Sequence, residues 1–97
     1  MKNKKYQCKD VSTHEILLFQ SYYNKDYNLH KPALDVLTSF PYDYPEKVVL
    51  TKMEQLEKKG LLEVGVSLRC SFLTDKAKEL LSSFAFVNVV VYIIYYL

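Results

Sequence analysis

Glycine and proline are scarce in this chain, with 2 Gly and 3 Pro among 97 residues. Collagen-like, low-complexity and disordered chains have a different composition, so these classes are excluded. The sequence contains no glycine-rich phosphate-binding loop, and it is shorter than most nucleotide-binding α/β domains. Since 49% of the residues are hydrophobic, we expect one folded domain with a buried core.

Cysteine is as rare as glycine, and Cys8 and Cys70 stand far apart without a CxxC motif. Together with His14 and His30 they lack the spacing of metal ligands, so we expect no metal and no cofactor. The first ten residues lack the apolar core of a secretory signal, which favours a reducing, cytoplasmic location without a disulfide. The GxSxG and HExxH motifs are also missing, and we therefore expect no enzyme activity.

Arginine is nearly absent, because Arg69 stands beside 12 lysines. The formal net charge is +2, and the four lysines within residues 1–9 contribute +4. Residues 10–97 therefore sum to −2, the difference between these two values. This distribution predicts a basic arm on a nearly neutral body. Duplex-binding domains usually carry a basic face on the folded body, so the charge gives little support for nucleic-acid binding.

Hydrophobic periodicity is the strongest signal that the sequence does contain, and it predicts helices. The first is expected to start after a capping box formed by Ser12 and Glu15, and the third to stop at Gly60. The predicted helices are Thr13–Tyr23, Pro32–Ser39 and Pro45–Lys59, with a fourth that begins at Thr74 and Asp75. A short strand is expected at Tyr27–His30.

After Gly60 the period of the apolar residues changes from that of a helix to that of a strand. We expect a hairpin formed by Leu61–Val64 and Leu68–Thr74, with a turn around Gly65. On the second strand, we expect one face to point inward, formed by Leu68, Cys70 and Phe72. The opposite face, expected to point outward, is formed by Arg69, Ser71 and Leu73.

The C-terminal residues 84–97 read FAFVNVVVYIIYYL, an uncharged segment with one clearly polar side chain, Asn88. Its β-branched and aromatic residues favour a strand, whereas the lack of Gly or Pro after the fourth helix begins favours a helix, and both remain open. A helix of this length spans about 21 Å, less than the ~30 Å hydrocarbon core of a membrane. We interpret the segment as a dimerisation element, because such an apolar surface should not stay exposed. The residues expected at the dimer contact are Phe84, Phe86, Val87, Val90, Val91, Ile94 and Tyr95.

The run from Met53 to Leu81, MEQLEKKGLLEVGVSLRCSFLTDKAKELL, resembles the core of many bacterial winged helix-turn-helix proteins. In those proteins a helix ends in a pattern like LEKKGLI, a β-wing follows, and the second wing strand closes in LT-x-K-G before another helix. Residues 59–61 (KGL) and 73–76 (LTDK) match this pattern, while Ala77 replaces the usual glycine.

By element order the resemblance extends over residues 12–83, and it implies an α+β fold that is mostly α. The implied architecture is a three-helix core with a β-hairpin wing, followed by an apolar C-terminal helix. The expected organisation is a basic arm over residues 1–11, a winged-helix domain over residues 12–83 and an apolar segment over residues 84–97.

In winged-helix proteins that bind DNA, the third helix enters the major groove and the wing reaches a minor groove. The resemblance thus implies a small bacterial or phage transcriptional regulator that binds double-stranded DNA as a homodimer. The implied DNA-binding residues are Lys47, Thr51, Lys52, Gln55 and Lys58 on the third helix, Ser67 and Arg69 on the wing, and Tyr42 and Tyr44 in the turn before that helix. Two alternatives remain open, a protein–protein interaction module with the same fold and a tail-anchored, membrane-associated protein.

Overall fold

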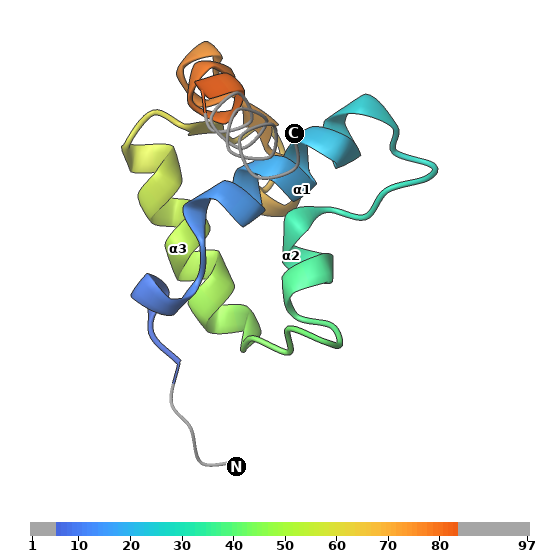
Figure 1. The fold of residues 1–97 in the computed structure, drawn as a ribbon, viewed down its shortest axis with the longest axis vertical. Coiled ribbons are helices and arrows are strands. Elements are labelled where there is room, and N and C mark those ends of the chain that lie inside the picture. The colour runs from blue at the N-terminus through green and yellow to red at the C-terminus, as the bar shows by residue number, and fades with distance from the viewer. Residues whose placement is uncertain (1–5, 84–97) are drawn as a thin grey trace, which may run out of the picture.

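The computed structural model of the chain describes residues 6–83. Within this range the protein is mostly helical and has one small antiparallel sheet of two strands (Figure 1). Residues 1–5 and 84–97, and with them the predicted dimer contact, lie outside the described residues. The elements in chain order are the 3₁₀ turn η1 (Cys8–Asp10), the helices α1 (Thr13–Lys25), α2 (Ala33–Leu37) and α3 (Glu46–Lys58), strand β1 (Leu62–Glu63), the 3₁₀ turn η2 (Leu68–Cys70) and strand β2 (Phe72–Leu73), followed by helical residues 75–83.

The predicted helix ends are confirmed to within two residues, because local hydrogen bonds define them. The Ser12 hydroxyl accepts a hydrogen bond from the Glu15 amide at 3.3 Å, which caps the start of α1. Gly60 ends α3 in the left-handed region, with φ 79°. The Thr74 hydroxyl accepts from the Ala77 amide at 3.2 Å and donates to the Gly60 carbonyl at 2.6 Å. One side chain thus starts the helix of residues 75–83 and satisfies a carbonyl just beyond the end of α3.

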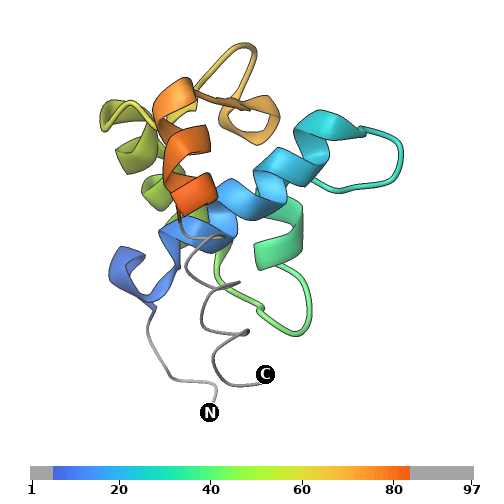
Figure 2. The same cartoon turned by 45° about the horizontal axis from the view of Figure 1, so that its top comes forward.

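The core lies where α1 crosses α2 and α3, as Figures 1 and 2 show. Helices α2 and α3 contribute buried apolar residues at three- and four-residue spacing, and α1 contributes Ile16 and Leu17, as expected for helices with one buried face. The buried apolar residues are Val11, Ile16, Leu17, Ala33, Leu34, Leu37, Val49, Met53, Leu56, Leu61, Leu62, Leu73 and Ala77. The sheet closes this core beside α3, with Leu62 opposite Leu73 and Glu63 opposite Phe72.

The prediction of a strand at Tyr27–His30 is wrong, because these residues form a turn at the end of α1. The Asp26 carboxylate accepts hydrogen bonds from the amides of Asn28 at 2.9 Å and Leu29 at 3.3 Å. The Asp26 carbonyl accepts from the His30 amide at 3.1 Å. An aspartate that bonds the backbone two residues ahead imposes a turn, and this local bonding replaces strand pairing here.

The predicted strand Leu68–Thr74 is wrong in extent and in register. Only Phe72–Leu73 is a strand, and residues 68–70 form η2 instead. Leu73, expected to point outward, is buried, whereas Phe72, expected to point inward, is 45% exposed. Cys70, expected on the buried face of a strand, is half-buried within η2. A 3₁₀ turn has about three residues per turn and does not continue the two-residue alternation of a strand. The residues of β2, which follows η2, therefore point to the opposite sides from those predicted.

The buried amide of Gln20 holds this loop against α1. Its Nε2 donates to the carbonyls of Arg69 at 3.2 Å and Ser71 at 2.8 Å. Its Oε1 accepts from the Ala33 amide, at the start of α2, at 3.0 Å. A fully buried amide thus joins three segments that are distant in the sequence.

Asn24, one turn further along α1, extends the same set of contacts. Its Nδ2 donates to the Ser71 carbonyl at 3.1 Å, and its Oδ1 accepts from the Leu73 amide at 3.4 Å. Two side-chain amides of α1 therefore occupy the outer edge of residues 69–73, where a further strand would otherwise supply hydrogen bonds. In Figure 2 the loop that carries η2 lies beside the C-terminal half of α1.

Candidate functional site

The face of α3 that points away from the core is a polar surface that the sequence also singled out. Val49, Met53 and Leu56 are fully buried, so the residues half a turn away from them point outward. The Thr51 hydroxyl on this face donates to the Lys47 carbonyl at 2.8 Å, one turn earlier. The outward residues are Lys47, Thr51, Glu54, Gln55 and Lys58, of which Thr51 is half-buried and the others are exposed.

The two lysines at the ends of this face lie on nearly the same line along the helix. Lys47 and Lys58 are separated by eleven residues, which corresponds to about 16 Å along the axis at 1.5 Å per residue. Thr51, Glu54 and Gln55 lie between them. The helix as a whole is neutral, because its three lysines are matched by three glutamates. The face thus has positive ends and a polar centre, without an overall positive charge.

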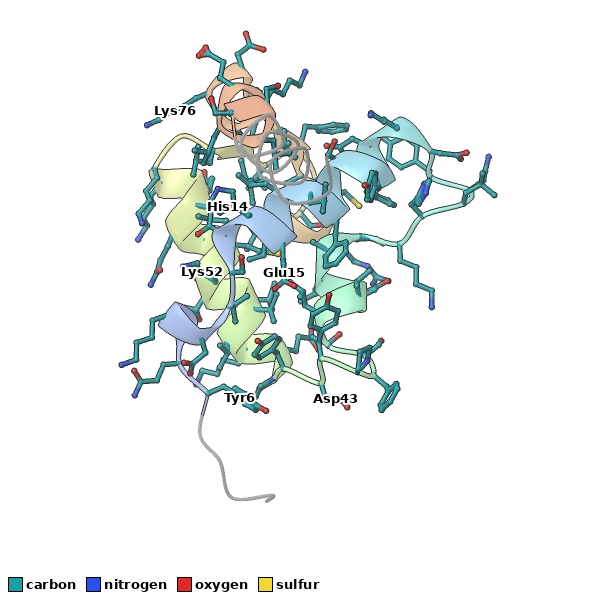
Figure 3. The ribbon with its side chains drawn as sticks, in the orientation of Figure 1. Tyr6, His14, Glu15, Asp43, Lys52 and Lys76 are labelled. Carbon is teal, nitrogen blue, oxygen red and sulfur yellow. The ribbon has the colours of Figure 1, made fainter. Side chains whose placement is uncertain are left out.

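Lys52, predicted to point outward with these residues, is half-buried like Thr51, and its position along α3 places it on the flank of the helix rather than at the centre of the outward face. It lies one turn after Val48, whose carbonyl is 3.9 Å from the Cys8 sulfur in η1. The side of α3 that carries Lys52 therefore faces the N-terminal segment. Figure 3 labels Lys52 at this position, and Glu15 and His14 on the neighbouring α1.

Tyr42 and Tyr44 are engaged in contacts within the molecule. Tyr42 packs edge-on against Phe19 of α1, with ring centroids 5.9 Å apart, and Tyr44 packs edge-on against Tyr6 at 5.0 Å. The Tyr44 hydroxyl donates to the Asp10 carbonyl at 3.1 Å. Their rings thus fasten the connection between α2 and α3 onto the N-terminal segment and α1.

The environment of these two hydroxyls also changes their acidity. Burial raises the pKa of Tyr42, and the charge and hydrogen bonding of Glu15 add to the increase. Burial likewise raises the pKa of Tyr44, with the Glu15 charge as the next cause. The direction of both shifts keeps the hydroxyls protonated, so they remain hydrogen-bond donors over the physiological pH range, as an unperturbed tyrosine also does.

Arg69 forms an ion pair with Asp35 of α2 rather than pointing freely from the loop. Its Nη2 lies 2.5 Å from an Asp35 carboxylate oxygen, and the two side chains are 56% and 29% exposed. This pair binds η2 to α2 and neutralises the only arginine of the sequence. Ser67 is exposed just before η2, and its neighbour Val66 is 95% exposed at the tip of the loop.

Sequence reasoning missed Gln20, Asn24 and Asp35, which position the loop of residues 64–71 relative to the helices. A signal for Gln20 was present, because it follows Ile16 and Leu17 at the spacing of the buried face of α1. A polar residue at such a position indicates a buried hydrogen bond. Its partners lie about fifty residues further along the chain, and no local pattern identifies them.

Among residues 6–83, no three His, Cys, Asp or Glu side chains form a group suited to hold a metal ion. No helix in that same range has the length and apolar character needed to cross a membrane.

Comparisons of the chain with protein-family models, with curated proteins and with solved structures return no match. The function must therefore be inferred from the residues and their geometry.

Proposed function

We propose that this protein binds double-stranded DNA as a winged helix-turn-helix transcriptional regulator, with α3 as its recognition helix. The observation that carries the proposal is the outward face of α3, on which Lys47 and Lys58 flank Thr51 and Gln55. In support, α2 and α3 are packed against each other beneath α1, and a short two-stranded sheet follows α3. This is the element order expected from the resemblance over residues 12–83.

The spacing of the lysines suits the major groove. The groove is about 12 Å wide, and the lysines are separated by about 16 Å along the helix. With α3 in the groove, Lys47 and Lys58 contact phosphates on its two sides, and Thr51 and Gln55 face base edges. Gln55 can form a bidentate contact with adenine, and Glu54 can accept from the amino group of cytosine.

The test is a titration of a labelled DNA duplex of mixed sequence, followed by fluorescence anisotropy at several salt concentrations. We expect binding at low salt, and we expect Lys47→Ala/Lys58→Ala to lower the slope of log K against log salt by about 2, since each phosphate contact contributes about 0.9. The matched control is Lys25→Ala/Lys78→Ala, which removes two exposed lysines from other helices and should leave the slope unchanged.

Two outcomes contradict this proposal. The first is the absence of binding by the unaltered chain at low salt. The second is an equal loss of slope in both double variants, because the lysines of α3 would then act only through the general charge of the protein. Selection of preferred duplexes from a random pool extends the test, since Thr51 and Gln55 variants should relax the preference without changing the salt slope.

The proposal includes a homodimer formed through residues 84–97. The support is the sequence alone, because this segment is uncharged and apolar and such a surface is stabilised by burial. A twofold pair would place two α3 helices for two half-sites of a DNA operator. Sedimentation of the full chain and of a chain that ends at Ser83 tests this part, and the full chain alone should dimerise.

The second candidate is a module that binds another protein through the same face. The observation that favours it is the neutral charge of α3, together with the pairing of Arg69 with Asp35. The duplex titration discriminates the two candidates, because a protein-binding module should not bind the duplex even at low salt.

A further inference from the structure

A shallow depression lies between the end of α3 and the helix of residues 75–83, apart from the outward face of α3. It has a volume of about 490 Å³ and opens to solvent. The residues that line it are Lys59, Leu61, Lys76, Glu79, Leu80 and Ser83. Lys76, Leu80 and Ser83 follow each other at four and three residues, so they lie on one face of the helix.

The walls of this depression are fixed to each other. The Lys76 ammonium donates to the Lys59 carbonyl at 3.1 Å, and the Thr74 hydroxyl donates to the Gly60 carbonyl at 2.6 Å. These two bonds tie the start of the helix of residues 75–83 to the end of α3. The depression is therefore preformed, which lowers the entropic cost of filling it.

The depression has an apolar floor and a polar rim. Leu61 is 7% exposed, and Leu80 remains 37% exposed although Ala77 on the same helix is fully buried. Lys59, Lys76 and Glu79 supply charged groups around the two leucines. An apolar centre with a charged rim is the usual composition of a protein–protein contact.

The sequence offers an occupant of the required chemistry. Residues 84–97 follow directly after Ser83, which lines the depression, and they carry no charge. The three- and four-residue steps from Leu80 to Ser83 continue in the sequence to Val87, Val90 and Ile94. To enter its own depression the chain would have to turn back after Ser83, at the end of the helix that lines it, whereas the segment of a second copy can approach from solvent.

We propose that this depression receives residues 84–97 of a second copy of the chain. In a twofold pair each copy donates one segment and one depression, so the contact closes on itself. This inference rests on the homodimer of the proposed function and adds the surface on which the partner segment binds. It does not depend on DNA binding by α3.

The first experiment is sedimentation equilibrium of the full chain and of Leu80→Lys. A lysine at position 80 places a charge on the apolar floor, and we expect the dimer dissociation constant to rise at least tenfold. The matched control is Leu29→Lys, which changes a leucine that is 77% exposed in the turn after α1 and should leave the constant unchanged. Circular dichroism verifies that both variants remain folded, as their partial exposure predicts.

The second experiment identifies the donor of the segment. Leu80 is replaced by benzoylphenylalanine in a ¹⁴N chain, which is mixed with unaltered ¹⁵N chain, irradiated and analysed by mass spectrometry. We expect cross-links that join ¹⁴N residue 80 to ¹⁵N peptides of residues 84–97. Cross-links found only within ¹⁴N chains contradict the inference, because the segment would then lie on its own copy.

The failure of the inference and that of the proposed function are distinguishable. A dimer whose dissociation constant is the same with Leu80→Lys overturns the inference and leaves the dimer in place. A chain that is monomeric at every concentration overturns both the inference and the dimer. DNA binding by Lys47 and Lys58 is judged separately, from the salt slope of the duplex titration.

Discussion

Helix α3 and the segment of residues 64–73, which consists of the loop of residues 64–71 and strand β2, are in contact, yet they are held in place by different kinds of interaction. The backbone hydrogen bonds of α3 lie within the helix, and three buried apolar side chains anchor it. Strand β2 pairs with β1 at only two positions, and the side-chain amides of Gln20 and Asn24 on α1 bond three further backbone groups of the segment, the carbonyls of residues 69 and 71 and the amide of residue 73. The outward side chains of α3 can therefore be replaced without disturbing the packing of the helix, whereas the conformation of the loop depends on residues of α1.

Among changes that act on the loop, the largest effect is expected from loss of the buried Gln20 amide. Gln20→Leu keeps a similar volume but leaves the Ala33 amide and the Arg69 carbonyl without their Gln20 partner. An unsatisfied buried group costs about 1–3 kcal/mol, so we expect a loss of about 2–4 kcal/mol in the free energy of unfolding. Urea denaturation followed by circular dichroism measures it.

Lys25→Ala, an exposed change on the same helix, is the control for Gln20→Leu and should alter stability by less than about 0.5 kcal/mol. A cost for Gln20→Leu as small as that of the control would contradict the dependence of the loop on α1.

The next effect in size belongs to Asn24→Ala. This change removes one of the two amides that bond the Ser71 carbonyl and the acceptor of the Leu73 amide. We expect a loss of about 1–2 kcal/mol, less than for Gln20, because Ser71 keeps its bond to Gln20.

In the double variant with Gln20→Leu the Ser71 carbonyl loses both amide partners, so the two costs should not add. Strict additivity would show that the two amides act on the loop independently.

Helix α3 could be predicted from the sequence, and the loop could not. The signals for α3 are local, because Val49, Met53 and Leu56 recur at helical spacing and Gly60 stops the helix. The centre of the outward face of α3 followed from the same spacing, whereas Lys52 lies on the flank of the helix. That side chain is half-buried because the N-terminal segment covers its side of the helix, and helical periodicity does not reveal such a neighbour.

The conformation of the loop could not be predicted for the same physical reason. Alternating apolar residues in residues 68–74 favour a strand locally, but the amides of Gln20 and Asn24 fix the backbone from about fifty residues away. Arg69 similarly resembles a free wing residue in the sequence, and its partner Asp35 lies 34 residues earlier. Interactions at this separation carry no periodic signal.

Ser71→Ala tests whether the backbone or the side chains of the loop carry its stability. The Ser71 hydroxyl is buried without a hydrogen-bond partner among the described residues, while its carbonyl accepts from both amides of α1. Removal of an unsatisfied buried hydroxyl should stabilise the protein, by up to about 1 kcal/mol. The measurement is the urea midpoint at unchanged m-value. Destabilisation instead would show that the hydroxyl takes part in the loop structure.

The smallest effects on stability are expected from changes on the outward face of α3. Gln55 and Lys58 are exposed, and their replacement by alanine removes no contact that holds the helix, which also tolerates alanine well. We expect stability changes below about 0.5 kcal/mol, and under the proposed function Lys58→Ala should also lower the salt slope of duplex binding by about 1. Leu56→Ala, on the buried face of the same helix, should cost about 2–5 kcal/mol. If Gln55→Ala or Lys58→Ala destabilised the protein as much as Asn24→Ala does, the outward side chains would contribute to the stability of the fold. They would then not form a surface that is free to serve binding alone.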